Sequence, residues 1–238
     1  MNIYVSEFLG TALTMFLVGC FWAWGTSKSQ NEDRAQDWEK INFILRISTP
    51  IATVISCLAF RNSTTYFNSA LTVALAIEGT LSWKVAALYI AAQAAGFLAT
   101  SMLLSLCFWK LYRKAYPAGA AVILNGNVGG KDFSWHKEIG LTFLLVFLIK
   151  LIGRLPVEDI IQIILFGVVN LFLAIKYKAY EYYCLNPLRD LIPRLFRKCL
   201  PSYKVGYTWW DNCKAAWFGP FIGAIAAAWF YGLIFLVF

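Results

Sequence analysis

The fold is decided by the stretch Tyr182-Tyr183-Cys184-Leu185-Asn186-Pro187-Leu188-Arg189-Asp190-Leu191, which lies between the last two long apolar segments of a 238-residue chain. An arginine and an aspartate in a lipid setting are costly, so they need a structural or functional reason. Asn186 is a favoured residue for capping a helix, and Pro187 fits a first helical position. We therefore predict a short helix that begins at Pro187, beside Arg189, between two membrane spans.

The composition is that of a protein built for lipid. The chain is 60% hydrophobic and 14% charged, whereas soluble domains carry roughly 25% charged residues. We therefore expect an integral, multi-pass membrane protein, in the plasma membrane or in an internal membrane. The net charge of +8 comes from basic residues in the loops between apolar segments. Lipid headgroups or solvent account for these charges, and no nucleic-acid partner is expected.

The apolar segments are of two lengths. Crossing a bilayer takes about 20 apolar residues. Six segments are long enough or nearly so, namely 3–24, 41–60, 83–109, 137–151, 160–175 and 215–238. The stretch from Asn68 to Gly79 is apolar but too short to cross, with a capping residue at its start and a glycine stop at its end. A re-entrant half-helix explains both properties, because irregular backbone is tolerated at that depth only beside protein or a water-filled cavity.

The two halves of the chain follow the same order. Glu7 with Thr11, and Glu138 with Thr142, open the first and fourth spans at the same spacing. Each half then runs span, span, asparagine-headed half-helix, span. Three spans per half is an odd number, so the second half is inverted and the half-helices meet near the bilayer midplane. The predicted fold is an all-α membrane protein with six transmembrane helices and two re-entrant half-helices in an inverted repeat.

This arrangement predicts one membrane domain over residues 1–238. The first repeat covers about 1–110, a connecting loop covers 111–136, and the second repeat covers about 137–238.

These motifs resemble those of the aquaporin and aquaglyceroporin family, the major intrinsic proteins. The resemblance rests on Glu7-Phe8-Leu9-Gly10-Thr11, Asn68-Ser69-Ala70, Gln93 with Gly96, Glu138, Asn186-Pro187-Leu188-Arg189-Asp190 and Gly219-Pro220-Phe221-Ile222-Gly223. It implies a passive channel for water and small neutral solutes such as glycerol, which excludes ions and protons. It also implies a homotetramer in the lipid bilayer, with no enzymatic activity and no cofactor. The family's Asn-Pro-Ala boxes are here Asn-Ser-Ala and Asn-Pro-Leu, which makes the chain an unorthodox member.

A channel mechanism also follows from physical chemistry. Two helix N-termini that point at one spot concentrate positive potential there, which repels cations and protons. Asn68 and Asn186 can offer amide donors to the oxygen of a passing water or polyol, and Arg189 adds a fixed charge. Glu7 and Glu138 are expected to accept hydrogen bonds from the half-helix loops. Ser69, Ala70, Pro187, Leu188 and Asp190 are the box neighbours that shape these loops.

Distances from the two boxes place the family's constriction. Arg189 matches it outright, and Tyr183 and Ala174 lie three and twelve residues before Asn186. Ser48 lies twenty residues before Asn68, and the neighbouring Thr49 is nearly as good a match. Without a large ring at 48 and without a histidine at 174, we expect a wider opening than that of a strict water channel.

Other interpretations remain open at this point. Cys199 and Cys213 flank a polar loop and could form a disulfide if that loop faces an oxidising space. The only histidine, His136, lies in a loop, so no metal site is expected. A non-conducting membrane structural protein is the main alternative function, because Leu188 and several tyrosines add bulk near the boxes. An inverted-repeat secondary transporter is a weaker one, because no further membrane acid offers a site for a coupling ion.

Overall fold

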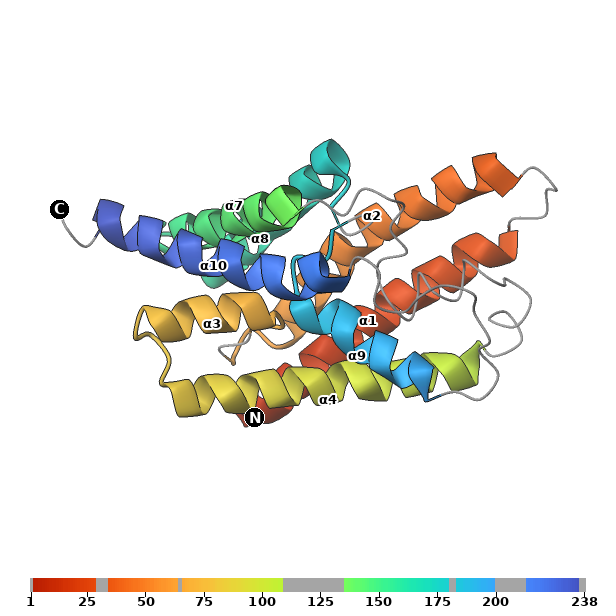
Figure 1. Ribbon diagram of the computed structural model, residues 1–238, viewed down its shortest axis with the longest axis horizontal. Helices are drawn as coiled ribbons and strands as arrows, with labels where there is room; N and C mark the ends of the chain where they lie inside the picture. Colours follow the sequence, from red (N-terminus) through yellow and green to blue (C-terminus); the bar gives the residue numbers. More distant parts are fainter. Residues whose placement is uncertain are drawn as a thin grey trace.

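The computed structural model is described for residues 2–28, 34–63, 66–108, 135–179, 183–199 and 213–235. Within these ranges the regular structure is helical, apart from one isolated bridge between Ala179 and Tyr183 (Figure 1). The helices are α1 (Ile3–Lys28), α2 (Arg34–Ala59), α3 (Ser69–Ile77), α4 (Trp83–Cys107), α7 (Trp135–Gly153), α8 (Asp159–Tyr177), α9 (Pro187–Lys198) and α10 (Cys213–Phe235).

The predicted spans are found, with shifted ends. The structure extends the predicted segments 41–60 and 137–151 at their starts, to Arg34 and Trp135. Helix α4 ends at Cys107, and the last described residue of α10 is Phe235. Hydrophobicity locates a span in the membrane, but the helix continues past the apolar residues because backbone hydrogen bonds propagate it.

Two charged residues of the less apolar helix α7 are paired inside the protein. Helices α1, α4, α8 and α10 are long and apolar enough to cross a membrane by composition alone. Helix α7 carries Glu138 and Lys150 instead. Glu138 is fully buried against a loop, and Lys150 forms an ion pair with Glu78, the residue that caps the end of α3. These two charges are therefore met by protein rather than by lipid.

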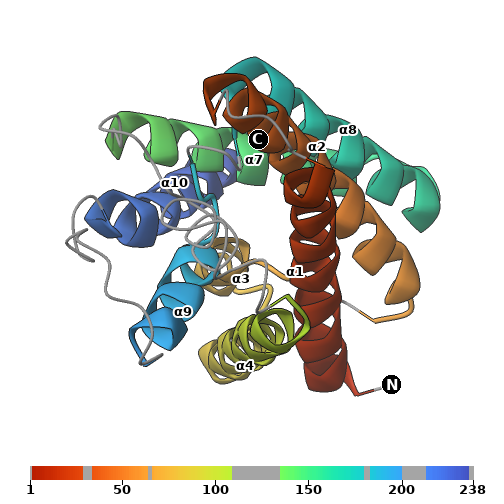
Figure 2. The ribbon, with the colours of Figure 1, turned by 90° about the vertical axis from the view of Figure 1, so that its right-hand side faces the viewer.

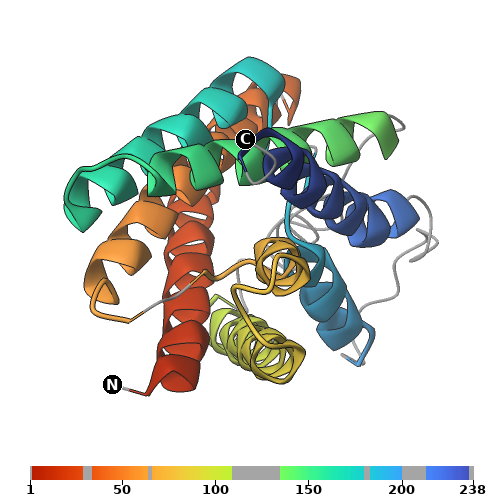
Figure 3. The same cartoon turned by 90° about the vertical axis from the view of Figure 1, so that its left-hand side faces the viewer.

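The helix contacts repeat between the two halves. Helices α1, α2, α3 and α4 correspond in order to α7, α8, α9 and α10. Helix α1 packs on α4 as α7 packs on α10, α3 packs on α10 as α9 packs on α4, and α2 packs on α8. The end-on views in Figures 2 and 3 show α3 inside the bundle and α9 between α10 and α4. Exchanging the halves leaves these contacts unchanged, as an inverted repeat requires.

The two half-helices begin near the middle of the molecule and run in opposite directions (Figure 1). Helix α3 has 9 residues and α9 has 12. At 1.5 Å per residue these lengths correspond to roughly 14 and 18 Å, against a hydrocarbon core of about 30 Å. Each half-helix therefore reaches only part of the way through the membrane, as the sequence predicts.

Glycines let the outer helices approach closely at matching points. A Cβ atom at Gly96 of α4 would lie 2.7 Å from the carbonyl oxygen of Phe8 on α1. A Cβ atom at Gly223 of α10 would lie 2.3 Å from the carbonyl oxygen of Ile139 on α7. Phe8 and Ile139 directly follow Glu7 and Glu138 in the sequence. The close contacts therefore hold α1 against α4, and α7 against α10, at corresponding positions next to the two glutamates.

Candidate functional site

The residue that precedes each capping asparagine is held in an unusual conformation. Phe67 and Leu185 have φ angles of 50° and 54°, in the left-handed region that non-glycine residues rarely adopt. Such a conformation costs on the order of 1–3 kcal/mol and persists only where the surroundings impose it. The left-handed turn aims each loop at the bilayer midplane and puts Asn68 and Asn186 at the tips of α3 and α9.

The two asparagines lock the loops together. Asn68 Nδ2 donates to the carbonyl oxygen of Leu185, and Asn186 Nδ2 donates to the carbonyl oxygen of Phe67, both at 3.0 Å. Asn68 Oδ1 also caps α3 by accepting from the backbone N–H of Ala70 at 2.9 Å. A side-chain amide has two N–H donors, and the lock uses one on each residue. The second N–H of each asparagine is left for another acceptor.

Ser69 adds a bond between the half-helices that proline could not make. Its hydroxyl donates to Asn186 Oδ1 at 2.9 Å, and its backbone N–H points to the same oxygen at 3.4 Å. Pro187 holds the matching position in the second box and has no N–H or hydroxyl. The Asn-Ser-Ala box therefore exchanges the fixed φ of proline for a direct hydrogen bond across the interface.

The two span-opening glutamates bind these loops from behind. Glu7 accepts from the backbone N–H groups of Tyr66 and Phe67, and Gln93 Nε2 donates to Glu7 Oε2 at 2.8 Å. Glu138 accepts from the backbone N–H of Cys184 at 2.7 Å and of Leu185 at 3.2 Å. Both carboxylates are fully buried, and their oxygens satisfy N–H groups that the left-handed turns leave without a helical partner.

Helix α9 is fastened by a second buried carboxylate. Asp190 is fully buried and accepts from Arg194 Nε at 2.9 Å and Nη2 at 2.7 Å, one helical turn further on. Trp217 Nε1 of α10 donates to the same carboxylate at 2.7 Å. This network fixes the face of α9 that carries Arg189, which is itself 4% exposed.

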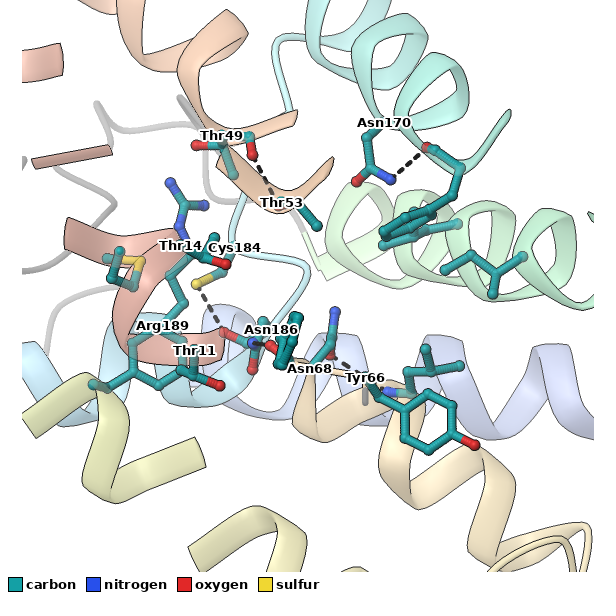
Figure 4. A pocket seen from close by; sticks show the side chains of 17 residues that line it. Thr11, Thr14, Thr49, Thr53, Tyr66, Asn68, Asn170, Cys184, Asn186 and Arg189 are labelled. Atoms are coloured by element: carbon teal, nitrogen blue, oxygen red, sulfur yellow. Dashed lines mark hydrogen bonds between the residues drawn. The ribbon is translucent and has the colours of Figure 1, made fainter. Parts of the chain in front are cut away.

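A narrow cavity runs past the asparagine pair (Figure 4). About 60 Å³ of it is open to the centres of water molecules, enough for about four waters at 10–15 Å³ each. It is lined by Thr11, Thr14, Met15, Thr49, Thr53, Tyr66, Phe67, Asn68, Leu71, Phe97, Leu145, Ile149, Phe166, Asn170, Cys184, Asn186 and Arg189. In Figure 4, Arg189 and Tyr66 lie on opposite sides of the asparagines.

A wider cavity of about 360 Å³ adjoins the narrow one. Tyr66, Leu71, Ile149 and Phe166 line both cavities. Arg61 and Asp159, both exposed, stand on the wider one. The four shared residues, three apolar and one tyrosine, stand between the narrow cavity and the wider one.

The predicted constriction residues are not all on the cavity wall. Arg189 lines it, and so does Thr49, whereas the adjacent Ser48 is buried and does not. Ala174 and Tyr183 are buried together in an apolar cluster and do not line the cavity. Counting from the boxes located α2 and α8, but on α2 a shift of one residue turns a side chain by about 100° around the helix. Tyr183 lies between α8 and α9 and not on a helix.

Sequence reasoning missed several lining residues. Thr11, Thr14, Thr53, Phe166 and Asn170 lie on the wall, Asn170 one turn before the predicted Ala174. For the polar residues among them, the sequence does contain a signal: polar side chains recur at helical spacing inside apolar spans, as Thr49 and Thr53 do.

Leu188 does not crowd the contact between the half-helices. Leu188 packs against Met15 and Phe97, so its bulk is taken up by α1 and α4 rather than at the contact between half-helices.

Cys199 is exposed and Cys213 is buried, and both are free thiols. The disulfide that the sequence left open is therefore absent between these two described residues.

Six spans, two inward half-helices and a cavity beside their asparagine tips are the features of a membrane channel built as an inverted repeat. The sequence profile of the major intrinsic protein family matches residues 1–231, and the chain belongs to that family. It is accordingly an integral membrane channel and not an enzyme.

Known proteins of the same length support this assignment. The chain is 29% identical to a glycerol uptake facilitator protein of Streptococcus pneumoniae serotype 4, over 98% of this chain and 99% of that protein. It is 26% identical to a probable glycerol uptake facilitator protein of Thermotoga maritima, over 99% and 100%. The aquaglyceroporin of Plasmodium falciparum has a similar fold, with a TM-score of 0.78, 18% identity, and coverage of 99% of this chain and 97% of that one.

Proposed function

We propose that this chain conducts water and small neutral solutes such as glycerol passively across the membrane and excludes ions and protons. The observation that carries the proposal is the asparagine pair. Asn68 and Asn186 are bonded to each other's loops and keep one N–H each at a cavity wide enough for a short file of waters. The glycerol uptake facilitators among the relatives support glycerol as a solute.

The site can replace a solute's hydration without binding it tightly. The remaining asparagine N–H groups and Arg189 offer donors to a passing oxygen. Leu145, Ile149 and Phe166 offer apolar surface to the carbon atoms of a polyol. Because polar contacts are few and spread along the path, a solute can enter and leave quickly.

Ions are disfavoured by the same geometry. The N-termini of α3 and α9 meet at the asparagines and give that point positive potential. Arg189 adds a full positive charge to the wall. The buried acids Glu7, Glu138 and Asp190 are engaged with protein donors and do not line the cavity, so they offer no site for a coupling cation.

The constriction is proposed to lie at Arg189. Thr49, beside Ser48, lines the same cavity, and Ala174 and Tyr183 are buried in one apolar cluster. We further propose that residues 1–238 act as one membrane domain and, by family resemblance, that four chains assemble as a homotetramer. Chemical cross-linking in the membrane, resolved by size, tests the assembly.

The direct test is osmotic swelling of proteoliposomes. Purified protein at a fixed protein-to-lipid ratio is expected to raise the rate of water flux above that of empty liposomes, with a low activation energy, and to pass glycerol without any ion gradient. The proton permeability should match that of empty liposomes. Flux equal to lipid alone would contradict the proposal and favour a non-conducting structural role, and flux that needs a gradient would favour a transporter.

Substituting Arg189 with valine sharpens the test. The variant removes the charge at the proposed constriction and should raise proton or ion leakage, while water still passes. Lys84→Ala, at an exposed position outside both cavities, is the matched control for the loss of one positive charge.

A further inference from the structure

Aromatic rings line the seam between α7 and α10. The two helices run side by side toward the end of the molecule where the C-terminus lies (Figure 1). Phe143 and Phe147 of α7 are stacked with their ring centroids 5.9 Å apart, and the ring of Phe230 on α10 lies 5.7 and 5.6 Å from them. The ring of Tyr231 lies 6.2 Å from that of Phe147 and 4.7 Å from that of Phe235. These five rings form one continuous row, here called the aromatic ladder.

The aromatic ladder is open to the outside of the helix bundle. Phe230 is 46% exposed, and the other four rings are half-buried. On the same helix, Trp229 and Leu233 are exposed as well. Exposed apolar surface of this extent marks a site for a membrane or for another protein. The ladder therefore offers apolar surface to an extended hydrocarbon chain that lies along the seam.

The length of the ladder corresponds to one leaflet of a bilayer. Phe143 lies ten residues before Gly153, the last residue of α7. Ten residues of helix rise about 15 Å, which is half of the roughly 30 Å hydrocarbon core. An acyl chain that followed the ladder from the middle of the membrane would therefore reach its headgroup where α7 ends.

Two cations stand at that end of the aromatic ladder. Lys150 Nζ lies 4.1 Å from the centroid of the Tyr231 ring. The guanidinium carbon of Arg154, the residue that follows α7, lies 4.4 Å from the centroid of the Phe235 ring and 5.8 Å from that of Tyr231. Cation–π contacts over these distances are attractive, so both cations are held against the rings.

Protein compensates the charge of Lys150 but not that of Arg154. Lys150 forms the ion pair with Glu78 that joins α7 to the end of α3. Arg154 is exposed and has no acidic partner among the described residues. A planar guanidinium held in one place is well suited to bind two oxygens of a phosphate group. At the end of a membrane span, the phosphates within reach belong to lipid headgroups.

We propose that the seam between α7 and α10 binds one anionic phospholipid, with its phosphate on Arg154 and an acyl chain along the aromatic ladder. This interaction goes beyond the proposed channel function and does not depend on which solute the protein conducts. A choline headgroup fits less well, because its trimethylammonium group would lie near the positive charge of Arg154. The lipid would also hold Tyr231 and α7 together beside the ion pair that fastens α3.

Thermal unfolding in a neutral detergent tests the site. Phosphatidylglycerol is expected to raise the melting temperature of the full chain in a saturable way, because a ligand that binds only the folded state stabilises it. Phosphatidylcholine and inorganic phosphate at the same concentrations should give little or no rise. The melting temperature without added lipid reports whether each sample is folded.

Arg154→Gln removes the proposed phosphate ligand. It should weaken the apparent affinity for phosphatidylglycerol about fivefold, the equivalent of one arginine beside an anionic headgroup. Lys84→Gln is the control, because it removes an exposed cation that contacts no ring among the described residues. It should keep the wild-type affinity.

Phe235→Leu keeps the charge of Arg154 but removes the ring that holds the guanidinium. It should weaken the apparent affinity about twofold, the equivalent of one exposed cation–π contact. This variant also carries the test if Arg154→Gln gives too little folded protein.

Three results would overturn the proposal. The first is equal affinity for phosphatidylglycerol in the wild type, Arg154→Gln and Phe235→Leu. The second is an equal rise in melting temperature with inorganic phosphate or with phosphatidylcholine, because the acyl chain or the anionic headgroup would then play no part. The third is an oligomer that dissociates in Arg154→Gln but not in the wild type in phosphatidylcholine bilayers, which would assign the seam to a second copy of the chain.

Discussion

Asn68 and Asn186 each donate a side-chain N–H to the carbonyl oxygen of the residue that precedes the other, at 3.0 Å in both directions. The two carbonyls belong to Leu185 and Phe67, whose backbones are in the left-handed region. The bonds therefore hold the two strained residues and the two donors at once. Neither half of the chain can complete its own loop without the other.

The first prediction concerns this lock. Asn68→Asp keeps the oxygen that caps α3 but removes the N–H groups, so the carbonyl of Leu185 loses its partner. We expect a loss of about 1–3 kcal/mol of stability, the cost of a buried acceptor left unpaired, and a lower melting temperature in detergent. Asn62→Asp, at an exposed position in the loop after α2, is the control. Equal melting temperatures for the two variants would show that the lock contributes nothing.

The second prediction concerns the glutamates behind the loops. Glu138→Gln keeps the shape but replaces one acceptor oxygen with an NH₂ group, which then faces the N–H of Cys184 or Leu185. Two N–H groups that face each other without an acceptor should lower the free energy of unfolding by about 2 kcal/mol or more. The thermal unfolding curve should shift down, and flux should fall as the loop moves. Glu158→Gln, at an exposed helix start with no side-chain cap bond, should change neither measurement.

The third prediction concerns the serine in the first box. Ser69→Ala removes the hydroxyl bond to Asn186 and should cost about 1 kcal/mol. Ser69→Pro restores the usual box but also removes the N–H, so we expect it to be no more stable than Ser69→Ala. A melting temperature above the wild type for Ser69→Pro would mean that the fixed φ of proline outweighs both bonds. Ser105→Ala, whose hydroxyl bonds only within its own helix, is the comparison.

The fourth prediction concerns close helix packing. Gly223→Ala would place a methyl group 2.3 Å from the carbonyl oxygen of Ile139. Because this oxygen belongs to the backbone of α7, it cannot move away without displacing the helix. We expect a loss of about 1–3 kcal/mol from overpacking, seen as a lower melting temperature and lower yield of folded protein. Gly140→Ala meets nothing within 4 Å and should be neutral or slightly stabilising. If both variants melt alike, the α7–α10 contact is not packed as described.

Several features of the fold could be predicted because they leave strong local signals. An asparagine cap before a short apolar run predicts a half-helix, and Glu7 and Glu138 at matching places predict the repeat. The inverted arrangement then follows from an odd number of spans. These inferences depend on residue type and order, which the sequence gives directly.

The wall of the cavity was harder to predict, because it depends on which way each helix faces. Ser48 and Thr49 are neighbours in sequence, yet only Thr49 lines the cavity. Ala174 lies one turn beyond Asn170 and is covered by packing. Leu188 was expected to crowd the half-helices, but α1 and α4 have room for it between Met15 and Phe97. Rotation and local space of this kind come from the tertiary contacts, and counting residues from the two boxes does not give them.

The reciprocal asparagine bonds also bear on biogenesis. Asn68 leaves the ribosome more than a hundred residues before Leu185, the residue whose carbonyl it binds. During synthesis the first loop therefore lacks the bond from Asn186 to the Phe67 carbonyl until the second half-helix has been inserted, and its turn depends on contacts within the first half such as those with Glu7. A chain truncated before Leu185 should show a protease-sensitive bond near Phe67 that the finished protein protects, which limited proteolysis of stalled translation products can detect.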